Sequence, residues 1–215
     1  SMNNFSDNMA LLMKGGVVMV PIVLLSIYTL WVIVLKIIQF NLVKPLRLKY
    51  VSSVIALLKN GEVERAKKLI ADQKGPVARV MEVTINLLQD EKLSKERMES
   101  EVERVGATEM RQLESHLRGL EMSGTISPLL GLLGTVIGMV KAFGQLAASS
   151  AQANPASLAN GIWEALITTV GGLVVAVPAV AAFYIIDGYV EKVRGAMRDS
   201  ATQVLLLEKQ ISSKK

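Results

Sequence analysis

Two threonines, a lysine and a glutamate are the residues of this chain whose types and positions could serve in moving a charge. Thr135 and Thr169 lie inside long apolar runs, and Lys141 and Glu164 adjoin the ends of such runs. A threonine hydroxyl in an apolar helix can satisfy itself on the carbonyl one turn back, which leaves a structural role open. A charged side chain in hydrocarbon cannot be satisfied by one backbone carbonyl in this way. It costs about 2.5–3.5 kcal/mol on insertion scales, so Glu164 indicates an ion or substrate pathway unless it is wetted at an interface.

The sequence lacks the residues that catalytic or metal-binding chemistry would need. The chain has no cysteine and one histidine, His116, which excludes disulfides, thiol catalysis, thiolate metal sites and histidine-based metal or triad sites. No nucleophile with an adjacent base is apparent in the sequence. We therefore expect no catalytic residue, no metal site, no cofactor and no enzymatic activity.

Charge excludes nucleic acid as a partner. The net charge is +5, but the most charged segment, 41–121, holds 15 Lys/Arg against 13 Asp/Glu, a balance typical of solvated helices. Its one aromatic residue is Tyr50, so the basic residues have no platform on which bases could stack.

Three charge-free runs are long enough to cross a bilayer, which takes about 20 residues. They comprise residues 15–35, 122–140 and 165–186, of 21, 19 and 22 residues. We predict transmembrane helices at 16–40, 122–146 and 161–187. The first is bulky, with Trp31 as an interfacial anchor and Lys36 snorkelling towards the inner interface.

Basic residues set the orientation, because short translocated loops avoid lysine and arginine. The loop 147–160 has none, whereas 41–121 has 15 and the tail 188–215 has six. The loop and the N-terminal segment 1–15 are therefore expected outside, and 41–121 and 188–215 inside.

The inner segments have helical patterns. Ser94 can cap a run whose apolar positions recur every three or four residues, and no strong breaker separates that run from the second span. This pattern predicts one continuous helix over 94–146, about 75–80 Å long, with His116 on its solvated face. The third span likewise continues through Val190, Val193, Met197 and Val204. The predicted fold is an all-α membrane protein with three transmembrane helices, two of them extended into a helical cytoplasmic domain.

Small residues recur along the second and third spans at helical spacing. Such stripes let two helix backbones approach closely, and proline or glycine can bend a helix where neighbours satisfy the freed carbonyls. The residues that we assign to helix packing are Pro128, Gly131, Gly134, Gly138, Gly171, Gly172 and Pro178.

Depth along the antiparallel spans relates the four polar residues. Lys141 lies about 9 Å outward of Thr135, and Glu164 about 7.5 Å outward of Thr169. The two threonines should therefore share one level, and Lys141 and Glu164 another, where we hypothesise an ion pair at the outer mouth, within one chain or between neighbours. Thr169 is turned about 140° from Glu164, which leaves open whether Glu164 lines a pore or supports its wall.

The strings SPLLGLLGTVIG and EALITTVGGLVVAVPAV, separated by a short Asn/Pro/Ser loop, resemble the paired signatures of the ExbB/TolQ/MotA proton-channel family. Three spans favour the ExbB/TolQ branch. The resemblance implies a homo-pentamer around two single-span helices of an ExbD/TolR-like partner, whose membrane aspartate carries the proton. It places hydroxyls at Thr135 and Thr169 and the acid of the third helix at Glu164, whereas Lys141 departs from the family pattern.

The resemblance also implies a function and a location. The chain would be a proton-channel subunit of a motor in the bacterial inner membrane, with a periplasmic N-terminus and a cytoplasmic C-terminus. The motor would use the proton motive force to energise TonB-dependent outer-membrane transport or Tol-Pal function through a TonB- or TolA-like transducer; ExbB and TolQ roles stay unresolved. The alternatives are a non-conducting oligomeric membrane scaffold and a stator subunit of a related motor.

Overall fold

The computed structural model describes residues 16–148 and 154–212, and every regular element in these ranges is a helix. The predicted N-terminal segment 1–15, the centre of the loop 147–160 and the last three residues lie outside the described residues. The described chain divides into two compact units. The first takes in residues up to Leu35 and His116–Ile185, and the second Lys36–Ser115 and the residues from Ile186 onward.

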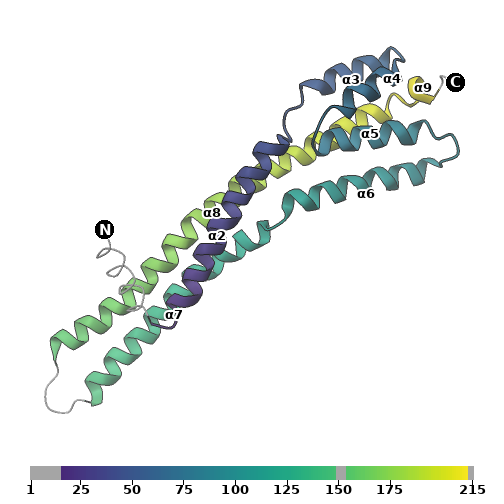
Figure 1. The fold of residues 1–215 in the computed structure, drawn as a ribbon. Helices are drawn as coiled ribbons and strands as arrows, with labels where there is room; N and C mark the ends of the chain where they lie inside the picture. Colours follow the sequence, from purple (N-terminus) through teal and green to yellow (C-terminus); the bar gives the residue numbers. More distant parts are fainter. Residues whose placement is uncertain (1–15, 149–153, 213–215) are drawn as a thin grey trace. The chain divides into compact units, whose positions relative to one another are not determined.

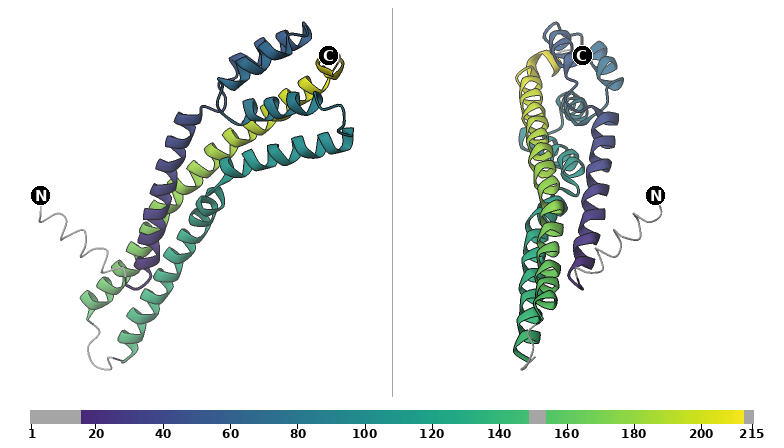
Figure 2. Two further views of the ribbon diagram at one scale, coloured as in Figure 1. Left: turned by 45° about the vertical axis from the view of Figure 1, so that its right-hand side comes forward. Right: turned by 90° about the vertical axis from the view of Figure 1, so that its left-hand side faces the viewer.

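Within residues 16–148 and 154–212, three helices are long and apolar enough to cross a membrane, as the sequence predicts (Figure 1). In the first unit, α7 and the early part of α8 run antiparallel and side by side, and the early part of α2 packs against them (Figures 1 and 2). Asn154 caps α8, since its Oδ1 accepts from the N–H of Ala156 at 3.0 Å, and Pro155 is suited to the first helical position. The helices are α2 (Met19–Val43), α7 (Leu117–Ala148) and α8 (Pro155–Leu205).

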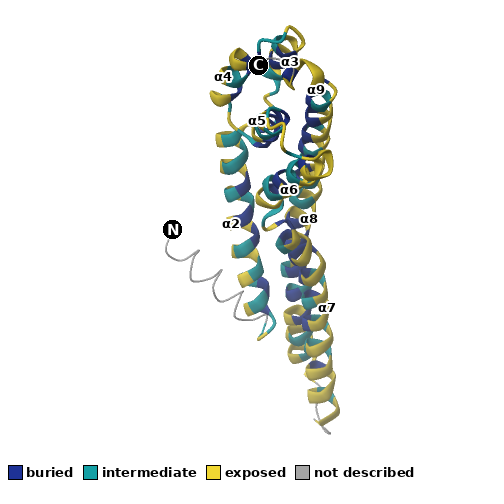
Figure 3. Ribbon diagram, turned by 90° about the vertical axis from the view of Figure 1, so that its right-hand side faces the viewer, coloured by how far each residue is buried: buried dark blue, intermediate teal, exposed yellow. Residues whose placement is uncertain are grey.

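Many large apolar side chains of these helices are exposed, and Figure 3 colours exposed positions yellow along α7 and α8. On α7 they include Leu129, Leu132 and Val136, and on α8 Val170 and Val174. A contiguous exposed apolar surface of this kind suits lipid or further subunits rather than water.

The second unit is a small helical domain with its own core. Amphipathic helices bury one apolar face each, with Leu58, Ile70, Met81 and Ile85 among the buried side chains. Gly75, at φ 109°, adopts a conformation that favours glycine just before Pro76 begins a helix. The helices are the end of α2 from Lys36, α3 (Lys49–Lys59), α4 (Val63–Ala71), α5 (Pro76–Leu88), α6 (Lys95–Glu114), the later part of α8, and α9 (Glu208–Ser212).

The later part of α8 contributes to this core in the register that the sequence predicts. Val190, Val193, Met197 and Val204 are all buried, and α8 is a single helix of 51 residues. The predicted extension of the third span is therefore present.

The predicted continuous helix over 94–146 is wrong. The first of two helices, α6, ends at Glu114, and α7 begins at Leu117. Ser115 has ψ 135° and His116 has φ 64°, neither of which is helical. His116 is exposed, but on the interruption rather than on a rod, and its ring meets the Trp31 ring edge-on with centroids 5.1 Å apart. The apolar periodicity continues through the break, so the pattern alone gave no sign of it.

The predicted snorkelling of Lys36 is also wrong. Its side chain is 0% exposed, and the ammonium donates to the Leu113 carbonyl at 2.6 Å, the Gln39 Oε1 at 3.0 Å and the Ser115 hydroxyl at 3.2 Å. The carbonyls at the end of α6 need donors. Satisfying them holds the ammonium inside the second unit.

Ser94 caps α6 as predicted. Its hydroxyl accepts from the N–H of Arg97 at 3.4 Å, and together with the backbone N–H of Glu96 it lowers the pKa of the Glu96 carboxyl, the backbone N–H having the larger effect. A lowered pKa means that this stabilisation is present above the ordinary carboxyl pKa and is lost as the pH falls through the lower, folded value.

Replacing the cap should therefore loosen the start of α6. Ser94→Ala is expected to cost about 1 kcal/mol of local stability, because the first amides of the helix lose an acceptor. Faster amide hydrogen exchange over residues 95–98 would measure it, with Ser52→Ala, an exposed serine hydroxyl on another helix, as the control. Unchanged exchange at those amides would contradict the assignment of the cap.

Candidate functional site

The two long helices of the first unit approach closely at glycines. A Cβ added at Gly131 would lie 2.9 Å from the carbonyl oxygen of Thr168 and 3.0 Å from the Cα of Thr169. One added at Gly172 would meet the carbonyl oxygen of Ser127 and lie 3.2 Å from the backbone of Gly131. Backbone lies against backbone here, and no side chain larger than hydrogen fits without movement.

The other residues assigned to packing follow the same two helices. Gly134 faces Thr168 and Gly138 faces Ala165, whereas Gly171 faces the Met19 side chain of α2. Pro128 and Pro178 lie inside α7 and α8.

The close approach brings the hydroxyls of Thr135 and Thr169 together. They hydrogen-bond each other, and both contact the Gly131 carbonyl oxygen, at 3.1 Å from Thr135 and 3.2 Å from Thr169. The Thr135 hydroxyl also lies 3.1 Å from the Ala165 carbonyl oxygen. The shared level expected from depth arithmetic is thus seen within one chain, at a point where both side chains are half-buried.

The chemistry of this pair follows from the number of protons. Each hydroxyl has one proton to donate and two lone pairs with which to accept, so the contacts are alternatives rather than a fixed set. A hydroxyl that donates to a backbone carbonyl is free to accept from a protonated acid. One that turns its proton outward can donate to a carboxylate. The pair can therefore hydrogen-bond either protonation state of an incoming carboxyl group.

Thr168 differs from its neighbour Thr169. Its side chain is buried, and its hydroxyl donates to the Ala165 carbonyl at 2.6 Å, with the Gly131 carbonyl at 3.4 Å. It fills the space beside Gly134. This arrangement fits the structural role that a lone membrane threonine usually has.

Lys141 and Glu164 line one cavity of about 300 Å³ in the first unit, together with Gly16, Gly138 and Gly161. A Cβ added at Gly16 would lie 3.6 Å from Glu164 Oε1. Both charged residues are exposed, and the ion pairs of the described residues do not include one between them. Their pairing across neighbouring subunits stays a prediction.

Sequence reasoning missed two serines on α7. Ser123 and Ser127 are fully buried and precede Gly131 and Thr135 at intervals of four residues. That spacing places all four on adjoining turns of the helix, and it was a readable signal. The two buried hydroxyls have no hydrogen-bond partner among the described residues, and they continue the row of small polar side chains from Thr135 towards the start of α7.

Comparison with known proteins agrees with this architecture. The MotA/TolQ/ExbB proton channel family matches residues 72–199, a range that includes both threonines. The chain is 40% identical over 95 residues to the biopolymer transport protein exbB1 of Vibrio cholerae, covering 44% of this chain and 42% of that protein. It is 33% identical over 185 residues to a putative ExbB-like biopolymer transport protein of Synechocystis, covering 81% and 68%.

A TolQ protein is also among the relatives. The chain is 47% identical over 75 residues to the Tol-Pal system protein TolQ of Pseudomonas aeruginosa, covering 35% of this chain and 32% of that protein. The similar region thus spans less than half of the Vibrio and Pseudomonas proteins. The family match covers more than half of the present chain, which therefore belongs to the MotA/TolQ/ExbB proton channel family, a family of membrane channel proteins rather than enzymes.

Proposed function

We propose that this chain is a proton-channel subunit of an inner-membrane motor that works with an ExbD/TolR-like partner. The motor would use the proton motive force to energise TonB-dependent outer-membrane transport or Tol-Pal function. The observation that carries the proposal is the meeting of the Thr135 and Thr169 hydroxyls between two candidate membrane spans. Membership of a proton channel family supports it.

The mechanism assigns the titrating group to the partner. Threonine does not titrate, so a membrane aspartate on the single-span partner carries the proton, and the hydroxyls of this chain hydrogen-bond it in either state. One elementary charge crossing 100 mV releases about 2.3 kcal/mol. In a homo-pentamer around a partner dimer, that energy would rotate the dimer and reach a TonB- or TolA-like transducer outside.

The proposed topology follows the basic residues. Segments 1–15 and 147–160 would be periplasmic, and 41–121 and 188–215 cytoplasmic, in the bacterial inner membrane. The exposed apolar faces of α7 and α8 support contact with lipid and with further copies of the chain.

Liposome flux measurements test the function. The chain would be co-expressed with the single-span protein that co-purifies with it, reconstituted, and assayed for proton uptake under an imposed potential. We expect flux from the complex and none when the partner aspartate is replaced by asparagine. A non-conducting scaffold would give no flux with any partner. A stator subunit would restore motility rather than outer-membrane transport in a cell that lacks its own subunit.

Glu164 and Lys141 give a separate prediction about assembly or coupling. Glu164→Ala should lower the pentamer fraction or the transport driven per proton, because it removes a charge from the cavity that both residues line. If the two side chains pair between neighbours, Lys141→Gln should have the same effect, and the double variant should lose no more than either one. Exposed pairs contribute about 0.2–1 kcal/mol, so a change of up to about fivefold is expected. Native mass spectrometry would measure the pentamer fraction, and strictly additive losses would contradict the pairing.

A further inference from the structure

The ammonium of Lys36 is buried in the second unit without a carboxylate partner among the described residues. Its hydrogen bonds go instead to the end of α6, and the shortest, at 2.6 Å, reaches the carbonyl oxygen of Leu113. A charged donor to a neutral acceptor is stronger than an ordinary backbone hydrogen bond. The Lys36 ammonium therefore caps the C-terminal end of α6.

The Leu113 carbonyl has another potential donor. In an uninterrupted α-helix each carbonyl accepts from the N–H four residues ahead, which for Leu113 is Leu117. In this structure α7 starts a separate series of backbone hydrogen bonds. At its beginning the Leu120 N–H donates to the His116 carbonyl at 3.1 Å. Lys36 thus occupies the acceptor that a continuous helix would use.

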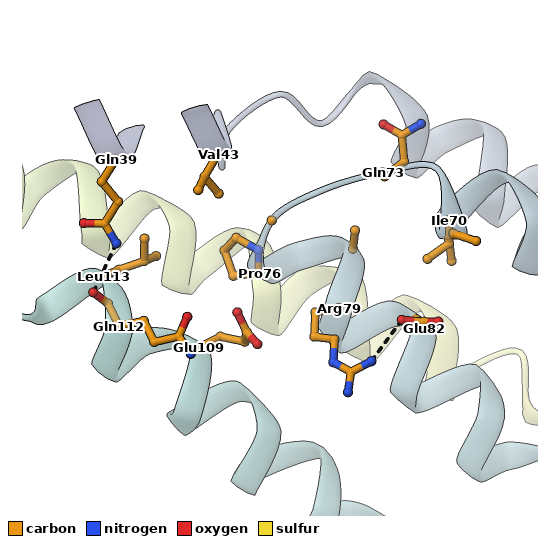
Figure 4. Close-up of a pocket in the computed structure, with 13 residues that line it drawn as sticks. Gln39, Val43, Ile70, Gln73, Pro76, Arg79, Glu82, Glu109, Gln112 and Leu113 are labelled. Atoms are coloured by element: carbon orange, nitrogen blue, oxygen red, sulfur yellow. Dashed lines mark hydrogen bonds and ion pairs between the residues drawn. The ribbon is translucent and has the colours of Figure 1, made fainter. Parts of the chain in front are cut away.

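The neighbouring carbonyl is satisfied in the same way. Gln112 accepts from the Gln39 side-chain amide at 3.2 Å and from the Ser115 hydroxyl at 2.8 Å. Figure 4 shows the Gln39 amide reaching Gln112 at the edge of a cavity of about 390 Å³. Lys36 and Gln39 lie about one turn apart on α2, so one face of that helix caps the end of α6.

The break between α6 and α7 depends on the contacts from α2, because no residue in the local sequence forces the helix to end. Segment 112–120 contains no proline, and its one glycine, Gly119, is itself helical. The residue with the left-handed conformation is His116, at φ 64°, which is unfavourable for a residue with a Cβ. Local sequence therefore favours a continuous helix, and contacts from α2 favour the break.

We propose that the junction between α6 and α7 has two states and that the Lys36 ammonium holds it in the interrupted one. With the ammonium on the Leu113 carbonyl the junction is interrupted. When α2 withdraws the ammonium, the Leu113 carbonyl accepts from the Leu117 N–H and the segment becomes one helix.

Hydrogen exchange distinguishes this role of Lys36 from that of a general stabilising contact. The test uses the full chain in lipid nanodiscs, with mass spectrometry of peptides that cover the junction. In Lys36→Met the amides of residues 117–119 gain helical acceptors, so we expect their exchange to slow by about tenfold, the effect of one backbone hydrogen bond on local opening. Lys36→Arg should exchange like the wild type. Lys59→Met, at an exposed lysine of α3, controls for the loss of one positive charge.

If Lys36 merely stabilised the fold, its replacement would speed the exchange of residues 117–119 instead of slowing it. Wild-type or faster exchange of residues 117–119 in Lys36→Met, with Lys59→Met unchanged, would overturn the proposal. A second pair of variants serves if Lys36→Met does not fold. Because His116 is exposed, His116→Ala should slow exchange at the same amides by favouring the helix, and His116→Gly should not, since glycine accepts positive φ. Equal exchange in these two variants would also overturn it.

Discussion

Thr135→Val and Thr169→Val are each expected to lower proton flux by about tenfold or more while the complex still assembles. Valine keeps the shape of the side chain but removes the hydroxyl that would hydrogen-bond the partner acid. A hydrogen bond to a charged group contributes about 1.5–3 kcal/mol, and about 1.4 kcal/mol corresponds to a factor of ten. The measurement is proton uptake by liposomes that contain the co-purified complex, normalised to the amount of assembled protein.

Matched variants separate the site from general effects of losing a hydroxyl. Thr125→Val alters a threonine on the same helix whose hydroxyl contacts the Glu121 carbonyl at 2.9 Å and is exposed, and it should keep normal flux. Thr135→Ser retains a hydroxyl and should retain most of the activity. Wild-type flux in both Thr135→Val and Thr169→Val would remove the pair from the pathway.

Gly172→Ala is expected to be among the most damaging single-methyl changes in the first unit. Its new Cβ would meet the Ser127 carbonyl and the backbone of Gly131, and neither can move without separating α7 from α8. Overpacking of this kind costs about 1–3 kcal/mol. A lower apparent melting temperature in detergent and a smaller yield of assembled complex would measure it. Separation of the two helices would also part Thr135 from Thr169, so flux should fall as well.

The adjacent glycine is the natural control. A Cβ at Gly171 would lie 3.2 Å from the terminal methyl of Met19, which is flexible and can shift, so Gly171→Ala should cost much less. Gly188→Ala, on the same helix with nothing within 4 Å, should be neutral or stabilising by up to about 1 kcal/mol. Equal melting temperatures for the Gly171 and Gly172 variants would show that backbone contact does not limit the packing.

Much of the candidate site could be predicted because it depends on periods fixed by helix geometry. A rise of 1.5 Å per residue placed Thr135 and Thr169 at one level, and they lie in hydrogen-bond contact. Small residues at intervals of three or four predicted the close approach of two spans, and Gly131 and Gly172 meet backbone to backbone. The same arithmetic placed Lys141 and Glu164 at one depth but could not set the directions of two flexible side chains.

The sequence by itself determined the helical class, the three apolar spans, the buried register of Val190, Val193 and Met197, and the residues at which two helices can touch. These follow from burying apolar surface and from the fixed period of the helix, which are local properties. Only the tertiary structure decided where α6 ends and what Lys36 does. Both depend on hydrogen bonds between residues 77 and 79 positions apart. No local pattern encodes which carbonyl a distant ammonium will reach, so the break at Ser115 and His116 appears only once α2 lies against the end of α6.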